Sequence, residues 1–382
     1  MPSRLPSEVR SALIAVLIAR TGVNAGLRIV YPFLPAIARG LGTSLAVLGV
    51  LLALRSLAGV VSPVVARLAE AHGRRDLMVV AALGVVAGSL LTAGAPGVAV
   101  AGIGCVLVGI AKPAFDVPMQ AWFGDRVPYE RRGRVLGATE LTWSIALLVT
   151  VPLSGLLISA TSWRAPFVLV AGLCLVGAAA VRLMIRPDRP HRPVPRPLRL
   201  NGPRVTILVI TLLFTVASEL LFVVYGAWLE DDVGLTVAGI GVFTAVVAVA
   251  ELTGEGLVTT VSDRLGLRRS IAAGLALSAL GYLMFGVVGA SVVLALVVVA
   301  VWLVGFEITI VAAIPFVSEL AVESRDRLLS LMVLVIAIGR AIGAVVAPPL
   351  YAVGGITASG VAAAACVVLA GLLILRVPSP GR

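Results

Sequence analysis

The stretch AEAHGRRD, residues 69–76, places five ionisable side chains in the middle of an apolar region. The segments on either side of it, residues 57–66 and 77–93, are almost wholly apolar. A similar stretch, VSDRLGLRRS, returns at residues 261–270, again between apolar segments. Short charged turns between long apolar segments are typical of a chain that crosses a membrane repeatedly, because the turns stay in water.

The composition supports this interpretation. Of the 382 residues, 60% are hydrophobic and 13% are charged, whereas soluble domains carry about 25% charged residues. The mean hydropathy is +1.10. A bilayer core about 30 Å thick requires roughly 20 apolar residues per spanning helix. On that scale the sequence predicts twelve spanning helices, at residues 11–36, 44–66, 77–95, 98–121, 135–160, 165–185, 204–228, 236–260, 268–289, 291–318, 328–351 and 356–376.

The predicted fold class is therefore an all-α membrane protein. A spanning helix satisfies all of its own backbone hydrogen bonds in lipid. The strands of a membrane barrel would instead alternate between polar and apolar residues, unlike the long apolar segments of this sequence. Between the sixth and seventh helices lies a segment rich in proline and arginine, residues 186–203, which disfavours a helix and predicts a cytosolic linker. A surface for anionic lipids is the alternative. The expected domains are six-helix bundles at 1–185 and 204–382.

The two halves repeat each other. A shift of 193 residues aligns Gly73 with Gly266 and Arg75 with Arg268 in the turns after the second helix of each half. The same shift aligns Glu70 with Asp263. A shift of 194 residues aligns Asp125 with Glu319 and Tyr31 with Tyr225. Two related six-helix bundles, with pseudo-symmetry between them, are a known transporter design with the substrate site near the bilayer midplane.

The positive charges predict the orientation. If the N-terminus is cytoplasmic, 23 of the 30 Lys and Arg residues lie on the cytoplasmic side and only Arg39 and Arg164 on the other. Both termini are then cytoplasmic, as the excess of basic residues in cytoplasmic loops requires. The net charge of +11 follows from topology, so no nucleic-acid partner is expected. The three cysteines lie singly in apolar helices, and neither a metal nor another cofactor is expected.

The stretch ARLAEAHGRR, residues 66–75, resembles the signature of the major facilitator superfamily between its second and third helices. Ala stands for the usual Gly at position 66, and Glu for the usual Asp at position 70. The stretch FGDRVPYERRGRVLG, residues 123–137, resembles the family's loop between the fourth and fifth helices. The resemblance implies a secondary transporter that works by alternating access.

The resemblance also implies a cytosolic gate. Arginines at the glycine turn can bridge to Asp125 at the end of the fourth helix and hold one of the alternating states. In the alternative interpretation they only anchor the loop at the membrane surface. The residues expected in this gate are Glu70, Gly73, Arg74, Arg75, Asp125, Asp263 and Arg264.

Ionisable side chains inside a membrane cost roughly 2.5–3.5 kcal/mol each and are candidates for function. Away from the cytosolic ends of the predicted helices there are eleven: Arg20, Arg28, Arg55, Lys112, Asp116, Glu140, Glu219, Glu251, Glu255, Glu307 and Arg340. The third, sixth, ninth and twelfth helices have none in their middles, which agrees with the lipid-facing helices that the resemblance implies. The residues expected to contact substrate are Asn24, Arg28, Tyr31, Arg55, Lys112, Asp116 and Glu219.

Two alternatives remain for these residues. Arg20, Asn24 and Arg28 share one helix face because they are four residues apart, yet each arginine could be structural and paired with an acid elsewhere. Lys112 and Asp116 are also four apart and could neutralise each other instead of binding a ligand.

Proton coupling is predicted for Glu251, Glu255, Glu307 and Arg340. Glu251 and Glu255 are one helical turn apart with no basic residue within their helix, and two adjacent anions in a medium of low dielectric favour a proton on one of them. In the alternative, Glu255 pairs with a cytosolic arginine and Glu251 with Arg340.

The function expected is the proton-coupled movement of a small organic solute, by a monomer embedded in the bilayer. Efflux is favoured over uptake because TVPLSGLL, residues 150–157, partly matches the Gly- and Pro-rich signature of exporters in the family. The alternatives are an uptake symporter, or a lipid-handling or sensor protein of the same fold. An enzyme is disfavoured, because the only histidines, His72 and His191, lie in cytosolic segments and no catalytic motif is present.

Overall fold

The computed structural model describes residues 6–61, 64–65, 68, 71–187, 200–321 and 324–377, except for the side chains of residues 129–130, 132–134, 250, 253–264 and 325–326. These described residues form helices and no strand. The chain divides into two compact units. Unit 1 comprises Met1–Thr43 and Leu54–Pro193, and unit 2 comprises Ser44–Ala53 and Val194–Arg382.

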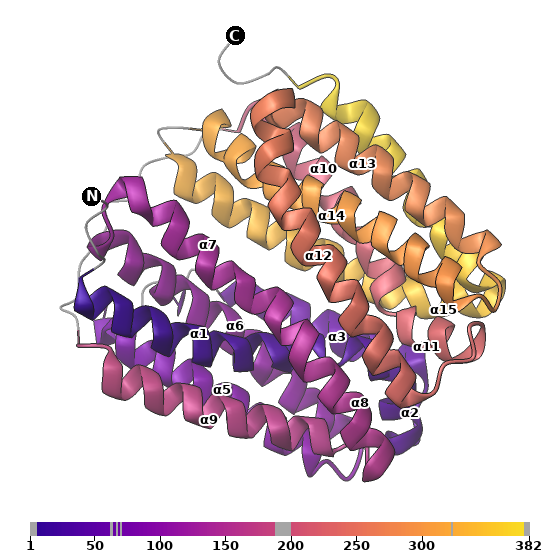
Figure 1. Ribbon diagram of the computed structural model, residues 1–382, viewed down its shortest axis with the longest axis horizontal. Coiled ribbons are helices and arrows are strands. Elements are labelled where there is room, and N and C mark those ends of the chain that lie inside the picture. Colours follow the sequence, from indigo (N-terminus) through magenta and orange to yellow (C-terminus); the bar gives the residue numbers. More distant parts are fainter. Residues whose placement is uncertain are drawn as a thin grey trace. The chain divides into compact units, whose positions relative to one another are not determined.

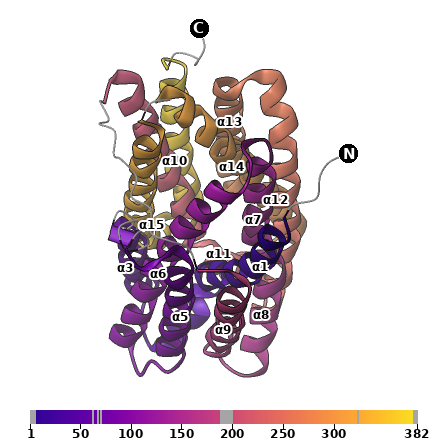
Figure 2. The same cartoon turned by 90° about the vertical axis from the view of Figure 1, so that its left-hand side faces the viewer.

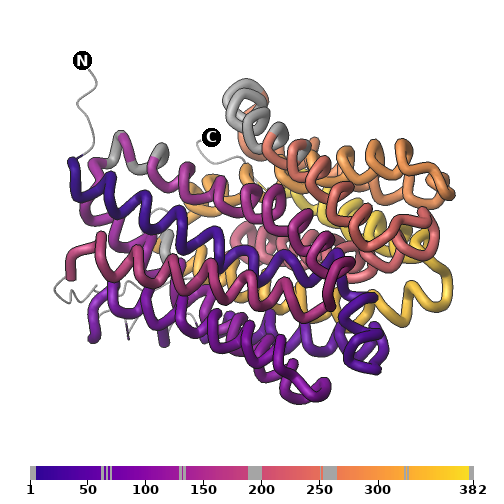
Figure 3. Tube along the Cα trace, turned by 60° about the horizontal axis from the view of Figure 1, so that its bottom comes forward, coloured from indigo at the N-terminus to yellow at the C-terminus, as the bar shows by residue number. Residues whose placement is uncertain are grey.

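The helices of unit 1 occupy the indigo to magenta part of Figure 1. They are α1 (Ser7–Arg28), η1 (Tyr31–Phe33), α2 (Leu34–Leu41), the end of α3 (Leu45–Leu57), η2 (Ala58–Val61), α5 (Arg74–Ala93), α6 (Val98–Arg126), α7 (Tyr129–Ile145), η3 (Ala146–Thr150), α8 (Val151–Ala160) and α9 (Ala165–Met184). In unit 1, α1 packs against α9 (Figure 3), and α5 packs against both α6 and α9 (Figure 2).

The helices of unit 2 follow the start of α3. They are α10 (Gly202–Phe222), α11 (Tyr225–Asp231), α12 (Val237–Leu265), α13 (Leu267–Met284), η4 (Phe285–Val287), α14 (Val292–Leu320) and α15 (Arg325–Ile374). Here α13 packs against α14 and α15, and α12 packs against α14. The boundary between the units at 193 falls inside the expected linker. The sequence did not predict that residues 44–53 group with unit 2, where Gly49 lies against the backbone of α15.

The described helices account for the twelve predicted spans. Nine are long and apolar enough to cross a membrane, and two shorter apolar helices lie at Leu45–Val61 and Val237–Val249. One of the nine, α15, consists of two helices joined where Gly354 and Gly355 leave helical geometry. This junction lies between the predicted eleventh and twelfth helices, and the all-α, twelve-helix prediction is confirmed.

The first span of each half contains a break that the sequence analysis did not predict. The predicted spans at 11–36 and 204–228 lie within Ser7–Leu41 and Gly202–Asp231, but inside them α1 ends at Arg28 and α10 at Phe222. The residues that follow, Ile29 and Val223, are 194 apart, which is the spacing of the sequence repeat. In unit 1 the break precedes Pro32, whose ring disfavours helical geometry in the residue before it.

The predicted fifth helix also differs. We expected residues 135–160, but the helix begins at Tyr129 and contains a π-helical turn, η3, between α7 and α8. Inside this turn the Thr150 hydroxyl donates to the Ala146 carbonyl, and one turn later the Ser154 hydroxyl donates to the Thr150 carbonyl. Hydroxyl groups that bond to the preceding turn bend transmembrane helices, and π turns are frequent at functional sites.

The repeat is visible in the backbone of the two charged turns. Gly73 and Gly266 have φ of 90° and 79° and directly precede α5 and α13. Residues with a side chain rarely adopt this geometry, so glycine is required at both places. Close helix packing repeats as well, since a Cβ atom on Gly88 of α5 or on Gly305 of α14 would lie 2.6 Å from the backbone of the neighbouring helix. Small residues let membrane helices approach closely.

Candidate functional site

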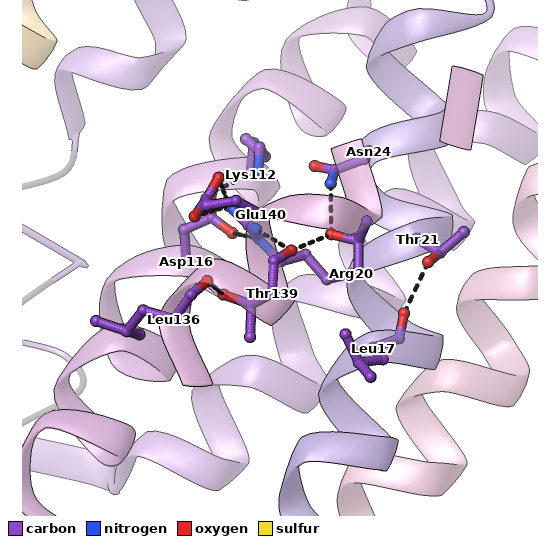
Figure 4. A network of polar contacts seen from close by, with 10 residues as sticks. Leu17, Arg20, Thr21, Asn24, Lys112, Asp116, Leu136, Thr139 and Glu140 are labelled. Atoms are coloured by element: carbon purple, nitrogen blue, oxygen red, sulfur yellow. Dashed lines mark hydrogen bonds and ion pairs between the residues drawn. The ribbon is translucent and has the colours of Figure 1, made fainter. Parts of the chain in front are cut away.

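A cluster of charged side chains joins α1, α6 and α7 in unit 1 (Figure 4). The Arg20 side chain is 4% exposed. Its Nε donates to Asp116 Oδ1 at 3.0 Å, and its Nη2 lies 3.0 Å from Glu140 Oε1. Its Nη1 donates to the Thr139 carbonyl. The Arg20 guanidinium therefore binds two carboxylates and one backbone carbonyl, which lie on α6 and α7. Its planar arrangement of N–H donors allows all three contacts at once.

Asp116 is the centre of this cluster. It accepts from Arg20 and also from the Lys112 ammonium one turn away on α6. Both side chains of this second pair are mostly buried, with 17% and 19% exposure. Lys112 and Asp116 therefore pair with each other, which is the alternative to ligand binding in the sequence analysis. Arg20 pairs with Asp116 and Glu140, which is the structural alternative for that arginine.

Asn24 lies one turn after Arg20 on α1 and is fully buried. Its amide nitrogen donates to Thr142 Oγ1 at 3.0 Å, and the Thr142 hydroxyl donates to the Thr139 carbonyl. Through Thr142, the Asn24 side chain of α1 is thus linked to the backbone of α7. The amide oxygen points away from Thr142 and has no hydrogen-bond partner among the described residues.

Arg28, one further turn along α1, is 7% exposed, and its guanidinium carbon lies 4.5 Å from the centre of the Trp143 ring. The Lys112 ammonium lies 5.7 Å from the same ring. Figure 1 shows α7, which carries Trp143, running alongside α1. The sequence analysis missed Trp143. The available signal was a tryptophan inside a predicted helix, three residues after Glu140.

Arg55 is held at the break in the first helix. It is 4% exposed, its Nη1 donates to the Leu27 carbonyl at 3.2 Å, and its guanidinium lies 5.2 Å from the centre of the Tyr31 ring. The last carbonyls of a helix lack partners within the helix, and a cation there also complements the helix dipole. Arg55 therefore caps α1 and fixes Tyr31 beyond the break.

The charged turn of unit 1, around residues 71–76, contains one of the expected ion pairs. Arg74 Nη1 lies 2.5 Å from Asp125 Oδ2 and donates to the Ala121 carbonyl, so it ties the start of α5 to the end of α6. Arg75 pairs instead with its neighbour Asp76, at 2.7 Å. The two adjacent arginines thus have different contacts, which the sequence alone does not distinguish.

Unit 2 has no equivalent of the Arg74 contact at the repeat position, because Leu267 stands there. The following residue, Arg268, donates to the Val377 carbonyl. Of the other residues expected in the gate, Glu70 and the side chains of Asp263 and Arg264 lie outside the described part of the chain.

Three carboxylates are buried in the membrane helices of unit 2. Glu219 on α10 is 1% exposed, Glu251 on α12 is 1% exposed and Glu307 on α14 is 5% exposed. Glu219 packs directly against Gly343 of α15, where no larger residue would fit. The side chain of Glu255 lies outside the described residues.

An aromatic cluster, which the sequence analysis also missed, lies beside these helices in unit 2. Phe222 of α10 contacts Trp302 and Phe306 of α14, at ring distances of 4.7 and 5.8 Å. Trp302 also contacts Tyr282 of α13 and Phe285 of η4. Phe222 and Phe306 are only partly buried, so unit 2 presents an aromatic surface close in sequence to Glu219 and Glu307.

Repeated spans, two related units and buried charges within them define a helical membrane transporter. The chain belongs to the Major Facilitator Superfamily, whose sequence profile matches residues 13–215 and again residues 207–382. It is 24% identical to the uncharacterized MFS-type transporter YwfA of Bacillus subtilis, over 89% of this chain and 85% of that protein. It is 27% identical to the class C tetracycline resistance protein of Escherichia coli, over 72% and 73%.

A solved structure supports the fold. The peptide transporter POT, crystallised with sulfate, superposes with a TM-score of 0.80 over 97% of this chain and 94% of that one. The sequence identity is 14%, so the likeness concerns the fold alone. No group of three or more His, Cys, Asp or Glu side chains able to hold a metal ion occurs among the described residues.

Proposed function

We propose that the protein exports a small organic solute in exchange for protons, by alternating access between its two units. The observation that carries the proposal is the burial of Glu251 and Glu307 in the spanning helices of unit 2. Ionisable groups at membrane depth are costly and mark ion pathways in transporters. A carboxyl group can lose that cost by taking up a proton, which makes it a suitable proton carrier.

Unit 1 supplies the solute site in this proposal. Its substrate contacts are Asn24, Arg28, Tyr31, Arg55, Lys112 and Asp116. In unit 2, Glu219 stays a separate prediction for a substrate contact. Within this set, Lys112 and Asp116 act mainly by neutralising each other, and Arg55 acts by holding the break before Tyr31. Proton coupling belongs to Glu251, Glu255, Glu307 and Arg340.

Export is favoured over uptake by the relative named for tetracycline resistance, because a transporter confers resistance when it lowers the drug concentration in the cell. The test uses inside-out membrane vesicles from bacteria that express the chain, energised so that protons accumulate inside. We expect at least one of a panel of labelled organic solutes, with tetracycline included, to accumulate, and a proton ionophore to abolish it. Accumulation only in right-side-out vesicles would favour the uptake symporter, and no flux in either would contradict transport.

The proposed orientation has both termini in the cytoplasm, as the distribution of basic residues favours. Asp231 then lies on the outer side, at the end of α11. A cysteine at Asp231 reacts with a membrane-impermeant reagent in intact cells if this orientation is right, and only after the cells are opened if it is reversed.

For the cytosolic turn we propose a gating role, in which the pair Arg74–Asp125 stabilises one of the alternating states. Replacement of either partner, Arg74→Ala or Asp125→Asn, should slow solute exchange across the membrane by up to about fivefold, because Asp125 is 55% exposed and exposed ion pairs contribute about 0–1 kcal/mol. Solute affinity should stay unchanged, since the pair lies at the helix ends. Arg75→Ala is the matched control, because Arg75 contacts Asp76. Equal slowing by Arg75→Ala would contradict a specific role for Arg74.

A further inference from the structure

Arg55 is a buried cation whose charge is not balanced by any described carboxylate. It is 4% exposed, its Nη1 donates to the Leu27 carbonyl, and its guanidinium lies over the Tyr31 ring. Among the described residues it forms no ion pair. A guanidinium is always charged in proteins, whereas the carbonyl end of a helix offers only about half an elementary charge in return. Roughly half of the charge of Arg55 is therefore left over.

The charge cluster of unit 1 does not supply the missing balance. The cations of Arg20 and Lys112 are matched there by the carboxylates of Asp116 and Glu140, so the cluster has two charges of each sign. Buried charges in proteins are normally paired, and ionisable groups at membrane depth are costly to keep. A negatively charged partner from outside the described residues would complete the balance at Arg55.

The surroundings of Arg55 hold it in place and leave donors available. A Cβ atom on Gly109 of α6 would lie 2.3 Å from the Arg55 carbonyl oxygen and 3.0 Å from its Cγ, so only glycine lets α6 come this close. Of the five N–H donors of the guanidinium, one is used by Leu27. The described polar atoms that are both sealed from solvent and without a partner lie on other residues, so the remaining nitrogens of Arg55 are not sealed. They lie at the break after α1, and interrupted spanning helices form the substrate sites of several transporter folds.

We propose that Arg55, in addition to capping α1, binds the anionic group of the transported solute. A carboxylate or another oxyanion accepts two parallel N–H bonds from the edge of a guanidinium, a geometry that lysine cannot offer. The Tyr31 ring covers one face of the guanidinium, so the anion binds in the guanidinium plane. The proposal rests on the transport function above and names its substrate class, an organic anion.

Probes that share one shape and differ in charge test this class directly. At neutral pH benzoate is an anion, benzamide is neutral and benzamidine is a cation, and the corresponding 2-naphthyl compounds extend the ring. Dissociation constants are measured by calorimetry on the full chain in detergent. We expect each acid to bind about tenfold more tightly than its amide, because charge-assisted hydrogen bonds are roughly twice as strong as neutral ones. The amidines should bind no more tightly than the amides.

Variants at two arginines separate anion binding from the capping of α1. Arg55→Gln should lower the acid-to-amide preference to about one, and Arg55→Lys should keep a reduced preference because it keeps the charge and loses the paired donors. A loss of the helix cap alone would weaken the acid and the amide equally, so the preference is the informative quantity. Arg164→Gln is the matched control and should leave the preference unchanged. Arg164 also donates to a backbone carbonyl, that of Ala95, and lies 4.4 Å from an aromatic ring, that of Trp163.

Several results would overturn the anion site: no binding of any acid, equal binding of acids and amides, a preference that survives Arg55→Gln, or an equal loss of preference in Arg164→Gln. If Arg55→Gln does not fold, Arg55→Lys decides, and an unchanged acid affinity in that variant contradicts the paired hydrogen bonds. The proposed transport fails separately. A protein that binds these acids but moves no solute in vesicles retains the anion site and loses the transport function. A protein that pumps only neutral or cationic solutes retains transport and loses the anion site.

Discussion

Asp116→Asn should be the most destabilising single substitution in the buried charge cluster of unit 1. Asp116 contacts two cations, Arg20 and Lys112, and both lie mostly out of solvent. Removing one partner of a buried ion pair costs about 3–5 kcal/mol because the other charge stays buried without compensation. Here the loss leaves two like charges close together. The measurement is thermal unfolding of the purified protein in detergent, with the midpoint compared to that of the unaltered chain.

A double variant distinguishes charge balance from packing. Asp116→Asn together with Lys112→Met leaves Arg20 paired with Glu140, so the charges balance again. We expect the double variant to unfold at a higher temperature than Asp116→Asn alone, since contacting residues have non-additive effects. Glu140→Gln is the exposed control, because the Glu140 side chain is 57% exposed and surface pairs contribute about 0–1 kcal/mol. Additive losses in the double variant would contradict the shared role of Asp116.

The sequence predicted the parts of the fold that depend on local composition. Twelve spans follow from apolar length, and the turns at Gly73 and Gly266 follow from a repeat that is visible without a structure. The Lys112–Asp116 pair follows from a spacing of four residues on one helix. Each of these signals lies within a single segment, or within two segments that repeat.

The sequence could not predict contacts that depend on how one helix is rotated against another. Arg20 reaches Asp116 and Glu140, which are 96 and 120 residues away, and no periodicity links these positions. The contact of Arg28 with Trp143 depends in the same way on the packing of α1 against α7. The break after Phe222 lacks a proline, so only its position relative to the break after Arg28 marks it.

Glu251→Gln should abolish uphill transport while solute binding and downhill exchange continue. Glu251 is 1% exposed within α12, and glutamine has nearly the same shape as a protonated glutamate. A variant that cannot release a proton keeps its solute site and loses the coupling to the gradient. One proton that crosses 100 mV releases about 2.3 kcal/mol, enough for roughly fifty-fold accumulation. We therefore expect the accumulation ratio to fall from tens to about one.

Glu307→Gln should have the same effect if the two carboxyl groups share the coupling proton. Glu319→Gln is the matched control, because Glu319 lies on the same helix as Glu307, α14, but is exposed near its end. The assay compares uphill accumulation with exchange of labelled for unlabelled solute in the same proteoliposomes. Loss of exchange together with accumulation would place Glu251 at the solute site instead. If both variants still accumulate solute in a gradient-dependent way, these buried carboxylates are structural and the proton crosses the membrane by another route.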